Sequence, residues 1–239
     1  MALRNKDQHR LDADAVTVVS RHYGDISEVP WDVQKYYEQR YSLFSKYDDG
    51  IWMTDDGWFG VTPEPIANSA SSGTFSPERN VLIDCFAGVG GNTIAFARTH
   101  RWLRIHAIEA DPTTLECAKH NAQIYGVSER ISWYQGDCFE ILKDAFPEQM
   151  DDCVIFASPP WGGPGYRFES VFDLSAMQPY HLSQLMACFQ SVTDNIVIYL
   201  PRTSDIRQLA AIARFSSKVV VTHYCIEGAS KAICAFFAK

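Results

Sequence analysis

The 239-residue sequence lacks several features that would assign it to common protein classes. No apolar run is long enough to cross a bilayer, and residues 1–16 contain no apolar core of a secretion signal. None of the seven cysteines belongs to a Cys-x-x-Cys pair, which disfavours a zinc site, and their odd number indicates reduced thiols. We therefore expect a soluble intracellular protein with no membrane contact and no bound metal.

Positive charge is also scarce. Lys and Arg number 21 against 29 Asp and Glu, which gives a formal net charge of -8. Such a balance disfavours binding of long nucleic acid through a broad basic surface, although it permits a single nucleotide or an RNA end in a pocket.

Repeats and low-complexity tracts are absent as well, while 46% hydrophobic and 13% aromatic residues suffice for a sizeable core. The chain divides into three segments. Residues 1–28 are polar and are expected to form a flexible tail, residues 29–75 a helical N-terminal extension, and residues 76–239 the main domain. Within the extension, large apolar residues at helical spacings predict one helix over 31–47.

After residue 76, short apolar runs alternate with helical patterns. Strands are expected over 81–86, 104–110, 131–137, 152–158 and 195–201, followed by an antiparallel pair over 217–227 and 230–238. Helices are expected between them, over 92–100, 112–126, 138–146, 181–192 and 203–215. This order predicts an α/β fold with three layers, built on a doubly wound, mostly parallel, seven-stranded sheet. Ligands of such folds bind at the carboxyl ends of the strands.

A glycine-rich turn, DCFAGVGGNT over residues 84–93, joins the first strand of this region to its helix. Its three glycines let the backbone turn sharply and approach a ligand closely. The dinucleotide fingerprint Gly-x-Gly-x-x-Gly is not met, because Thr93 stands at the last glycine position. Asp84 before the turn would repel a pyrophosphate but suits the amino group of a methionine moiety.

Acidic residues also follow the next two strands. Glu109 lies about 20 residues past the turn, where a carboxylate commonly accepts hydrogen bonds from ribose hydroxyls. Asp137 follows the third strand, in position to receive an adenine amino group. Either acid alone could be a solvated charge at a strand end. Together with Asp84 they favour S-adenosylmethionine over a nicotinamide dinucleotide, whose phosphates have no evident partner.

The fourth strand runs into SPPWGGPGY, residues 158–166. A small polar residue, two prolines and an aromatic residue next to a methyl donor are typical of amino-group methyltransferases. Ser158 would offer its oxygen to an exocyclic amine, Pro159 and Pro160 would make the turn rigid, and Trp161 would stack on the base. Catalysis would then come chiefly from proximity and orientation. The alternative is a proline turn whose tryptophan only covers the end of the sheet.

Several of these stretches together resemble one family. FGVTPEPIA, DCFAGVGGNT, HNAQIYGV, SPPWGGPGY and NIVIYLPR, preceded by KYYEQRYSLFSKYDDGI, are similar to the trimethylguanosine synthase (cap hypermethylase) family. Its members are class I S-adenosylmethionine-dependent methyltransferases with a Rossmann-like fold. The resemblance covers about residues 31 to 239. It implies two successive transfers to the N2 amine of a 7-methylguanosine cap, giving 2,2,7-trimethylguanosine and S-adenosylhomocysteine.

The resemblance also implies roles for single residues. Trp161 would stack on 7-methylguanine, whose positive charge strengthens stacking on an indole, and Ser158 with Pro159 would orient the amine. Phe44 from the extension would close over the same pocket. The cap phosphates would be held by Lys35, Tyr166 and Arg202. The cofactor would be bound by Thr62, Pro63, Asp84, Gly88, Glu109, Asn121 and Asp137, with glutamate at 109 where the family commonly has aspartate.

The family further implies small nuclear and nucleolar RNAs as substrates, recruitment by ribonucleoprotein proteins, and residence in the nucleus, in particular the nucleolus. We expect a monomer. Two alternatives remain open at this stage. One is an amino methyltransferase acting on guanine or adenine in structured RNA or DNA, and the other is an inactive cap-binding adaptor.

Overall fold

The computed structural model describes residues 21–71, 78–162, 166, 168–213, 218–226 and 228–238. They form a seven-stranded sheet in the order β3-β2-β1-β4-β5-β7-β6. The strands are β1 (Val81–Asp84), β2 (Arg104–Glu109), β3 (Ile131–Gln135), β4 (Cys153–Ala157), β5 (Ile196–Pro201), β6 (Lys218–Ile226) and β7 (Ala229–Ala238). Strands β1 to β5 pair in parallel, and β7 enters antiparallel between β5 and β6. The predicted fold class is confirmed.

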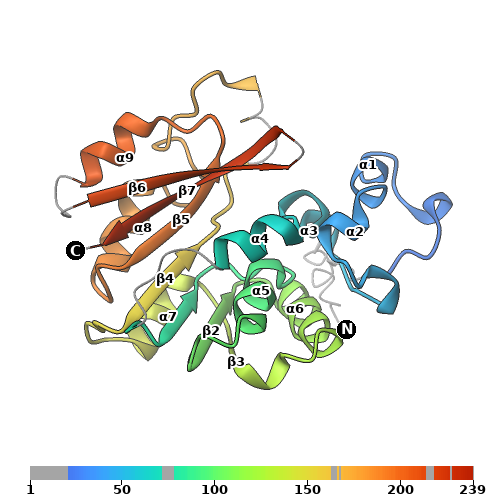
Figure 1. Ribbon diagram of the computed structural model, residues 1–239, viewed down its shortest axis with the longest axis horizontal. Coiled ribbons are helices and arrows are strands. Elements are labelled where there is room, and N and C mark those ends of the chain that lie inside the picture. The colour runs from blue at the N-terminus through green and yellow to red at the C-terminus, as the bar shows by residue number, and fades with distance from the viewer. Residues whose placement is uncertain are drawn as a thin grey trace, which may run out of the picture.

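Helices cover both faces of this sheet (Figure 1). They are α4 (Glu64–Ser71), α5 (Gly91–Arg98) and α6 (Pro112–Ile124) on one face, and α7 (Cys138–Ala145), α8 (Leu182–Gln190) and α9 (Ile206–Ala213) on the other. Successive side chains of a strand point to opposite faces of the sheet, so each face has its own hydrophobic core. In β1, for example, Leu82 belongs to one core and Ile83 to the other. The strand order reverses between β1 and β4, so the edge next to both is where a ligand site is expected.

The N-terminal extension is less regular than its sequence suggests. It consists of η1 (Ile26–Glu28), α1 (Gln34–Tyr37), α2 (Arg40–Leu43), η2 (Tyr47–Asp49) and α3 (Asp55–Gly60). The prediction of one helix over 31–47 is therefore wrong: the chain leaves helical geometry at Gln39 (φ -96, ψ 9) and again after Leu43. Tyr37, Phe44 and Tyr47 are nevertheless all buried, as their spacing on one helical face indicates.

The expected tail ends earlier than predicted. Arg21 forms a backbone bridge with Met53, and Tyr23 is buried, with its amide donating to the Tyr47 hydroxyl at 3.1 Å. Residues 21–28 thus belong to the extension, whereas residues 1–20 lie outside the described residues.

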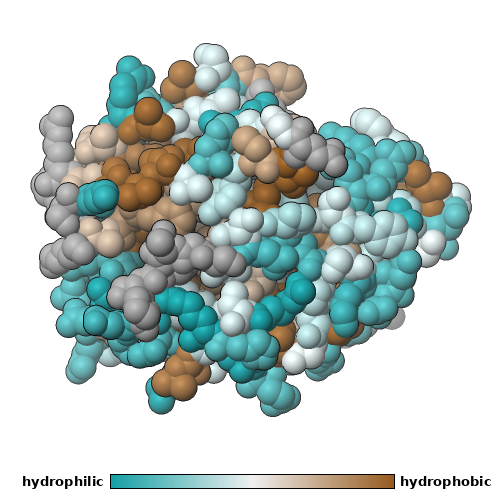
Figure 2. All heavy atoms as spheres, viewed as in Figure 1, coloured by the Kyte–Doolittle hydropathy of each residue, from teal (hydrophilic) through white to brown (hydrophobic). Residues whose placement is uncertain are grey.

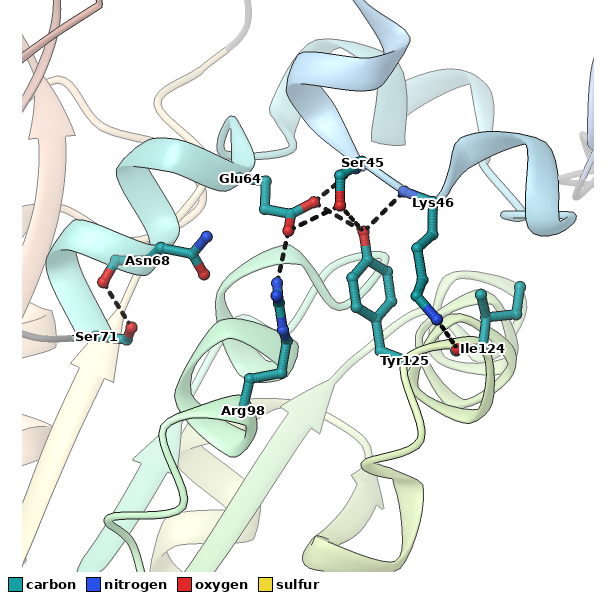
Figure 3. A network of polar contacts seen from close by, with 8 residues as sticks. All are labelled: Ser45, Lys46, Glu64, Asn68, Ser71, Arg98, Ile124 and Tyr125. Atoms are coloured by element: carbon teal, nitrogen blue, oxygen red, sulfur yellow. Dashed lines mark hydrogen bonds and ion pairs between the residues drawn. The ribbon is translucent and has the colours of Figure 1, made fainter.

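The carboxylate of Glu64 attaches this extension to the sheet domain (Figure 3). It accepts hydrogen bonds from the Ser45 amide at 2.6 Å, the Tyr125 hydroxyl at 2.8 Å and the Arg98 guanidinium at 2.5 Å. Burial alone would raise the pKa of Glu64, but these donors outweigh it and leave the pKa lowered. The N-terminal extension is consequently held against α5 and the end of α6 by one ionised group.

The antiparallel end of the sheet, formed by β6 and β7, has an apolar surface. Apolar residues gather over β6 and β7 in the view of Figure 2, and Val220 and Val221 are both exposed. Among the described residues, no helix is long and apolar enough to span a membrane.

Candidate active site

The glycine turn after β1 has the open geometry that its sequence predicts. Gly88 has a φ of 55° and Gly90 a φ of 97°, both in the left-handed region that glycine enters at little cost. A Cβ at Gly90 would lie 3.2 Å from the Cα of Ala118, whereas one at Gly88 would meet nothing within 4 Å. The turn is therefore packed tightly against α6 on one side and bordered by free space at Gly88.

Glu109 closes this turn from the neighbouring strand. Its Oε2 accepts from the Gly88 amide at 2.9 Å, and its Oε1 accepts from the Asp111 amide at 3.0 Å. The side chain is partly exposed, and burial raises its pKa although both amides lower it. Glu109 thus lies beside the free space at Gly88, where an acceptor for sugar hydroxyls was predicted.

Asp84 is placed differently from the prediction. It is fully buried beneath the turn, where the Thr93 hydroxyl donates to its Oδ2 at 2.6 Å and the Phe86 amide to its Oδ1 at 3.3 Å. Burial raises the pKa of Asp84 to about 6, while both donors lower it. In this conformation the carboxylate supports the turn from inside and presents no exposed oxygen to an amino group.

Asp137 caps α7 through its Oδ1, which accepts from the Phe139 amide at 2.8 Å. Its Oδ2 accepts from the hydroxyl of Tyr180, and this bond raises the pKa of Tyr180 to about 12. The Tyr180 ring also stacks on Phe139, with ring centroids 4.2 Å apart. The carboxylate predicted to receive an adenine amino group therefore has a tyrosine bound to it.

The side chain of Asn121 is bound by protein groups and has no exposed atom. It is fully buried on α6, where its Oδ1 accepts from the Trp52 amide at 2.8 Å. Its Nδ2 donates to the carbonyls of Trp52 and Val89, each at 2.9 Å. The expected cofactor contact is replaced by a clamp that joins the N-terminal extension to the glycine turn.

The threonine-proline pair before α4 lies next to the helix that follows the glycine turn. The Thr62 hydroxyl is buried and accepts from Asn92 Nδ2 at 3.0 Å, and Pro63 is partly exposed. A Cβ at Gly91 would come within 2.8 Å of Val61, so glycine there is needed for this close approach. Thr62 and Pro63 thus lie beside the start of α5, as a cofactor-site location requires.

The turn after β4 brings the predicted amine-aligning residues to the edge beside the glycine turn. Ser158 is partly exposed and Pro159 is buried. Trp161 is half-buried rather than free: its ring stacks on Tyr199 of β5 (centroids 5.9 Å apart, interplanar angle 22°) and meets the Tyr166 ring edge-on at 5.0 Å. Only part of the indole thus remains available to a base.

Arg202 directly follows β5 and is exposed at the same edge as this turn, because β4 and β5 run parallel. Tyr166 is partly exposed beside Trp161. Both positions suit the predicted contact with cap phosphates. Gly163 to Gly165, also in the motif, lie outside the described residues.

Two residues of the N-terminal extension are not brought to this turn. Phe44 is only 2% exposed and packs against Tyr125, with centroids 6.2 Å apart. Its predicted closure over the Trp161 pocket is not present in this structure, because the ring is packed in the core. Lys35 is exposed on α1 with its amino group 4.8 Å from the Tyr36 ring centre.

Sequence reasoning missed the residues that support the site from a distance. Tyr180 and Tyr199 stood in segments assigned to a loop and a strand, with no signal of their own. Glu64 was part of the quoted FGVTPEPIA motif but was not given a role. One sequence signal was present: a polar residue on the buried face of a helix, such as Asn121, needs a hydrogen-bond partner from another element.

The residues at this edge fit S-adenosylmethionine. The open backbone at Gly88 and the partly exposed carboxylate of Glu109 leave space and an acceptor on the side where Ser158 approaches, since β1 lies between β2 and β4. Within the described residues, no group of three or more His, Cys, Asp or Glu could hold a metal ion. Glu109, Asp137 and the Gly88 backbone would hold the cofactor.

Comparisons with known proteins agree with this geometry. The family model described as RNA cap guanine-N2 methyltransferase matches residues 79–239. The chain is 37% identical over 213 residues to trimethylguanosine synthase of Schizosaccharomyces pombe, covering 87% of each chain. It is 37% identical over 185 residues to trimethylguanosine synthase of Saccharomyces cerevisiae, covering 75% of this chain and 58% of the relative.

A solved structure shares the fold. A methyltransferase from Porphyromonas gingivalis W83 aligns with a TM-score of 0.62 at 16% identity, covering 88% of this chain and 51% of that one. The predicted family resemblance is confirmed. Since the family model covers about two thirds of the sequence and a 37% identical relative spans most of it, this chain belongs to the RNA cap guanine-N2 methyltransferase family.

Proposed function

We propose that this enzyme converts a 7-methylguanosine cap to 2,2,7-trimethylguanosine by two successive methyl transfers to the N2 amine. It is an S-adenosylmethionine-dependent RNA cap guanine-N2 methyltransferase. One observation carries the proposal: the turn with Ser158, Pro159 and Trp161 follows β4, directly beside the glycine turn that follows β1. The amine-aligning residues and the cofactor edge are thus neighbours across a single strand pair.

The bound cofactor supplies a methyl group on a sulfonium, a good electrophile. The part of the protein is then mainly to orient the amine. Ser158 offers a hydroxyl oxygen to an N–H of the exocyclic amine, and the adjoining proline backbone holds this oxygen in place. Because N–H groups donate only along defined directions, the acceptor orients the nitrogen lone pair.

Trp161 binds the base. The 7-methyl group leaves a positive charge on the guanine ring, which an electron-rich indole attracts more strongly than a neutral base. Tyr199 supports the indole from behind, so the ring is held in one orientation before the substrate arrives.

The proton leaves the amine after the new bond forms, when the nitrogen carries a positive charge. Asp84 does not receive it, since that carboxylate is sealed beneath the turn. The charge that 7-methylation places on the base weakens the hold on this proton, so water is a sufficient acceptor. The same arrangement serves the first and the second transfer.

Small nuclear and nucleolar RNAs are the substrates that we propose, with ribonucleoprotein proteins as recruiting partners and the nucleus, including the nucleolus, as the site of action. The family membership supports this proposal. Recruitment by ribonucleoprotein proteins would also explain how an acidic protein of net charge -8 reaches its RNA substrates without a broad basic surface.

A methyl-transfer assay on 7-methylguanosine diphosphate and on unmethylated guanosine diphosphate tests the function. We expect transfer to the first with hardly any to the second, and mass analysis should show products that carry one and then two added methyl groups. Equal rates on the two nucleotides would overturn the proposal. Binding of the cap without any binding of cofactor in calorimetry would instead indicate an adaptor.

A further inference from the structure

A second recess lies at the opposite end of the strands from the candidate site. It has a volume of about 670 Å³ and is bordered by Asn80 before β1, Arg104 at the start of β2 and Arg130 before β3. Because these strands are parallel, their carboxyl ends point away from it. The rise of β2 from Arg104 to Glu109 is about 17 Å, which gives the separation of the recess from the cofactor edge.

This recess is basic in an acidic protein. Three arginines line it, Arg101, Arg104 and Arg130, with Glu129 as the single acid among its lining residues. Arg104 and Arg130 are exposed, and no ion pair found in the described part of the chain includes either of them. Their charges therefore remain available to an anion, while the chain as a whole carries -8.

The recess also offers surfaces for flat rings. Trp102 itself is buried, and the Arg101 guanidinium covers its ring at 4.1 Å from the ring centre, with the side chain of the next residue, Leu103, 77% exposed. His100 borders the same space directly after the C-cap of α5, where its left-handed φ of 55° is a common helix ending. Nucleobases stack on the planes of arginine guanidinium groups, so the Arg101 guanidinium at this surface suits single-stranded RNA.

We propose that this basic recess, defined by Arg101, Arg104 and Arg130, binds backbone phosphates of the RNA chain downstream of the cap. The inference rests on the proposed function, in which a capped RNA is the substrate. A stacked strand with a rise of about 3.4 Å per nucleotide needs about five nucleotides to cover about 17 Å, so a bare cap nucleotide does not reach the recess. The cap site and the recess thus act as two linked contacts on one molecule.

An RNA chain is favoured over an acidic peptide because the bound cap already holds the RNA at the protein. Its phosphates are then present at a high local concentration, and two guanidinium contacts suffice to add measurable affinity. The recess contributes to substrate binding and leaves the methyl-transfer step unchanged.

The test compares a cap dinucleotide with a capped RNA of about 20 nucleotides, long enough for the span estimated from strand rise. The variant is Arg104→Gln combined with Arg130→Gln. We expect the KM and Kd for the long RNA to rise on the order of tenfold, and the slope of log K against log salt to shrink by about 1.4. The kcat and KM for the dinucleotide should stay as in wild type.

Arg207→Gln serves as the matched control, since it removes an exposed arginine of α9 that is already paired with Asp205. Arg104→Gln alone covers the case in which the double variant folds poorly, because Arg130 also donates to the Trp102 carbonyl. For Arg104→Gln we expect a slope change of about 0.7.

Three results would overturn the inference: equal wild-type affinity for the short and the long RNA, an equal loss on both substrates, or competition by an acidic peptide but not by uncapped RNA. Failure of the proposed function looks different. In that case wild type would not methylate even the dinucleotide, while RNA binding to the recess could still be measured by fluorescence anisotropy.

Discussion

The side-chain amide of Asn121 pairs with both backbone groups of Trp52, accepting from its N–H at 2.8 Å and donating to its C=O at 2.9 Å. The second amide hydrogen goes to the carbonyl of Val89 in the glycine turn. One buried residue thus attaches the N-terminal extension and the cofactor turn to the same helix.

Replacing this clamp should affect stability and cofactor binding together. Asn121→Leu leaves one buried and two part-buried backbone groups without this partner, and we expect the free energy of unfolding to fall by about 2 kcal/mol. S-adenosylmethionine affinity should fall as the glycine turn loosens. Urea unfolding and calorimetry measure the two effects. The control is Gln123→Leu, at an exposed position of the same helix, which should change neither quantity. Unchanged stability and cofactor affinity in Asn121→Leu would show that the clamp is dispensable.

The role of the Trp161 ring is separable from folding. Trp161→Ala should remove most cap binding, since stacking is worth about 1–3 kcal/mol per base, while the Kd for S-adenosylmethionine stays near normal. Trp161→Phe should retain part of the affinity, because it keeps a ring on Tyr199 but loses the electron-rich indole. Trp31→Ala, at a tryptophan 86% exposed on the extension, is the control. Unchanged cap affinity in Trp161→Ala would refute the stacking assignment.

Asp84 should show opposite effects on stability and on binding. Its folded-state pKa of about 6 lies above the ordinary value of about 3.9, so its contribution to stability is fully present below pH 3.9 and is lost as the pH rises through 6. Asp84→Asn removes this titration, so the stability of the variant relative to wild type should rise by on the order of 2–3 kcal/mol between pH 4 and pH 7.

Cofactor affinity should change in the other direction in Asp84→Asn, because the amide cannot accept from both Thr93 and the Phe86 N–H through two oxygens. We expect at least a tenfold weaker Kd for S-adenosylmethionine, a loss of about 1.4 kcal/mol. Asp144→Asn, at an exposed residue of α7, should show neither effect. A pH-independent stability difference would contradict the raised pKa.

Tyr180 is expected to orient Asp137 for the adenine amino group. Tyr180→Phe keeps the stack on Phe139 and removes only the hydroxyl, so we expect cofactor affinity to fall about fivefold, the worth of about one hydrogen bond. An analogue of S-adenosylhomocysteine with a 6-oxo group in place of the amine should bind wild type and variant equally. An equal loss for both ligands would indicate a merely structural role.

The contribution of Glu64 to attachment of the extension should depend on pH and be lost in acid. Its folded-state pKa is lowered, so its contribution is present above the ordinary value of about 4.3 and is lost as the pH falls through the folded-state value. Glu64→Gln should lower the free energy of unfolding at pH 7 by about 1–3 kcal/mol and flatten the acid limb. Glu116→Gln, in a more exposed pair with Lys119, is the control; a stability loss of equal size there would contradict this role.

Local patterns were sufficient for most of the fold. The apolar runs and glycines around β1 to β5 placed each strand within a few residues, because period and turn chemistry depend on near neighbours. The same patterns placed Glu109, Ser158 and Trp161 at one edge of the sheet. They did not predict the breaks at Gln39 and after Leu43, since tertiary packing overrides helix propensity there.

What the sequence determined by itself is thus the sheet, its edge and the family to which the chain belongs. Tertiary structure alone decided what the polar groups contact. Asn121 and Asp84 carry ordinary side chains for a cofactor site, yet both are buried with protein partners, because an unpaired buried polar group costs more than a lost ligand contact. Such partners come from residues far apart in the chain, and spacing along the sequence does not contain them.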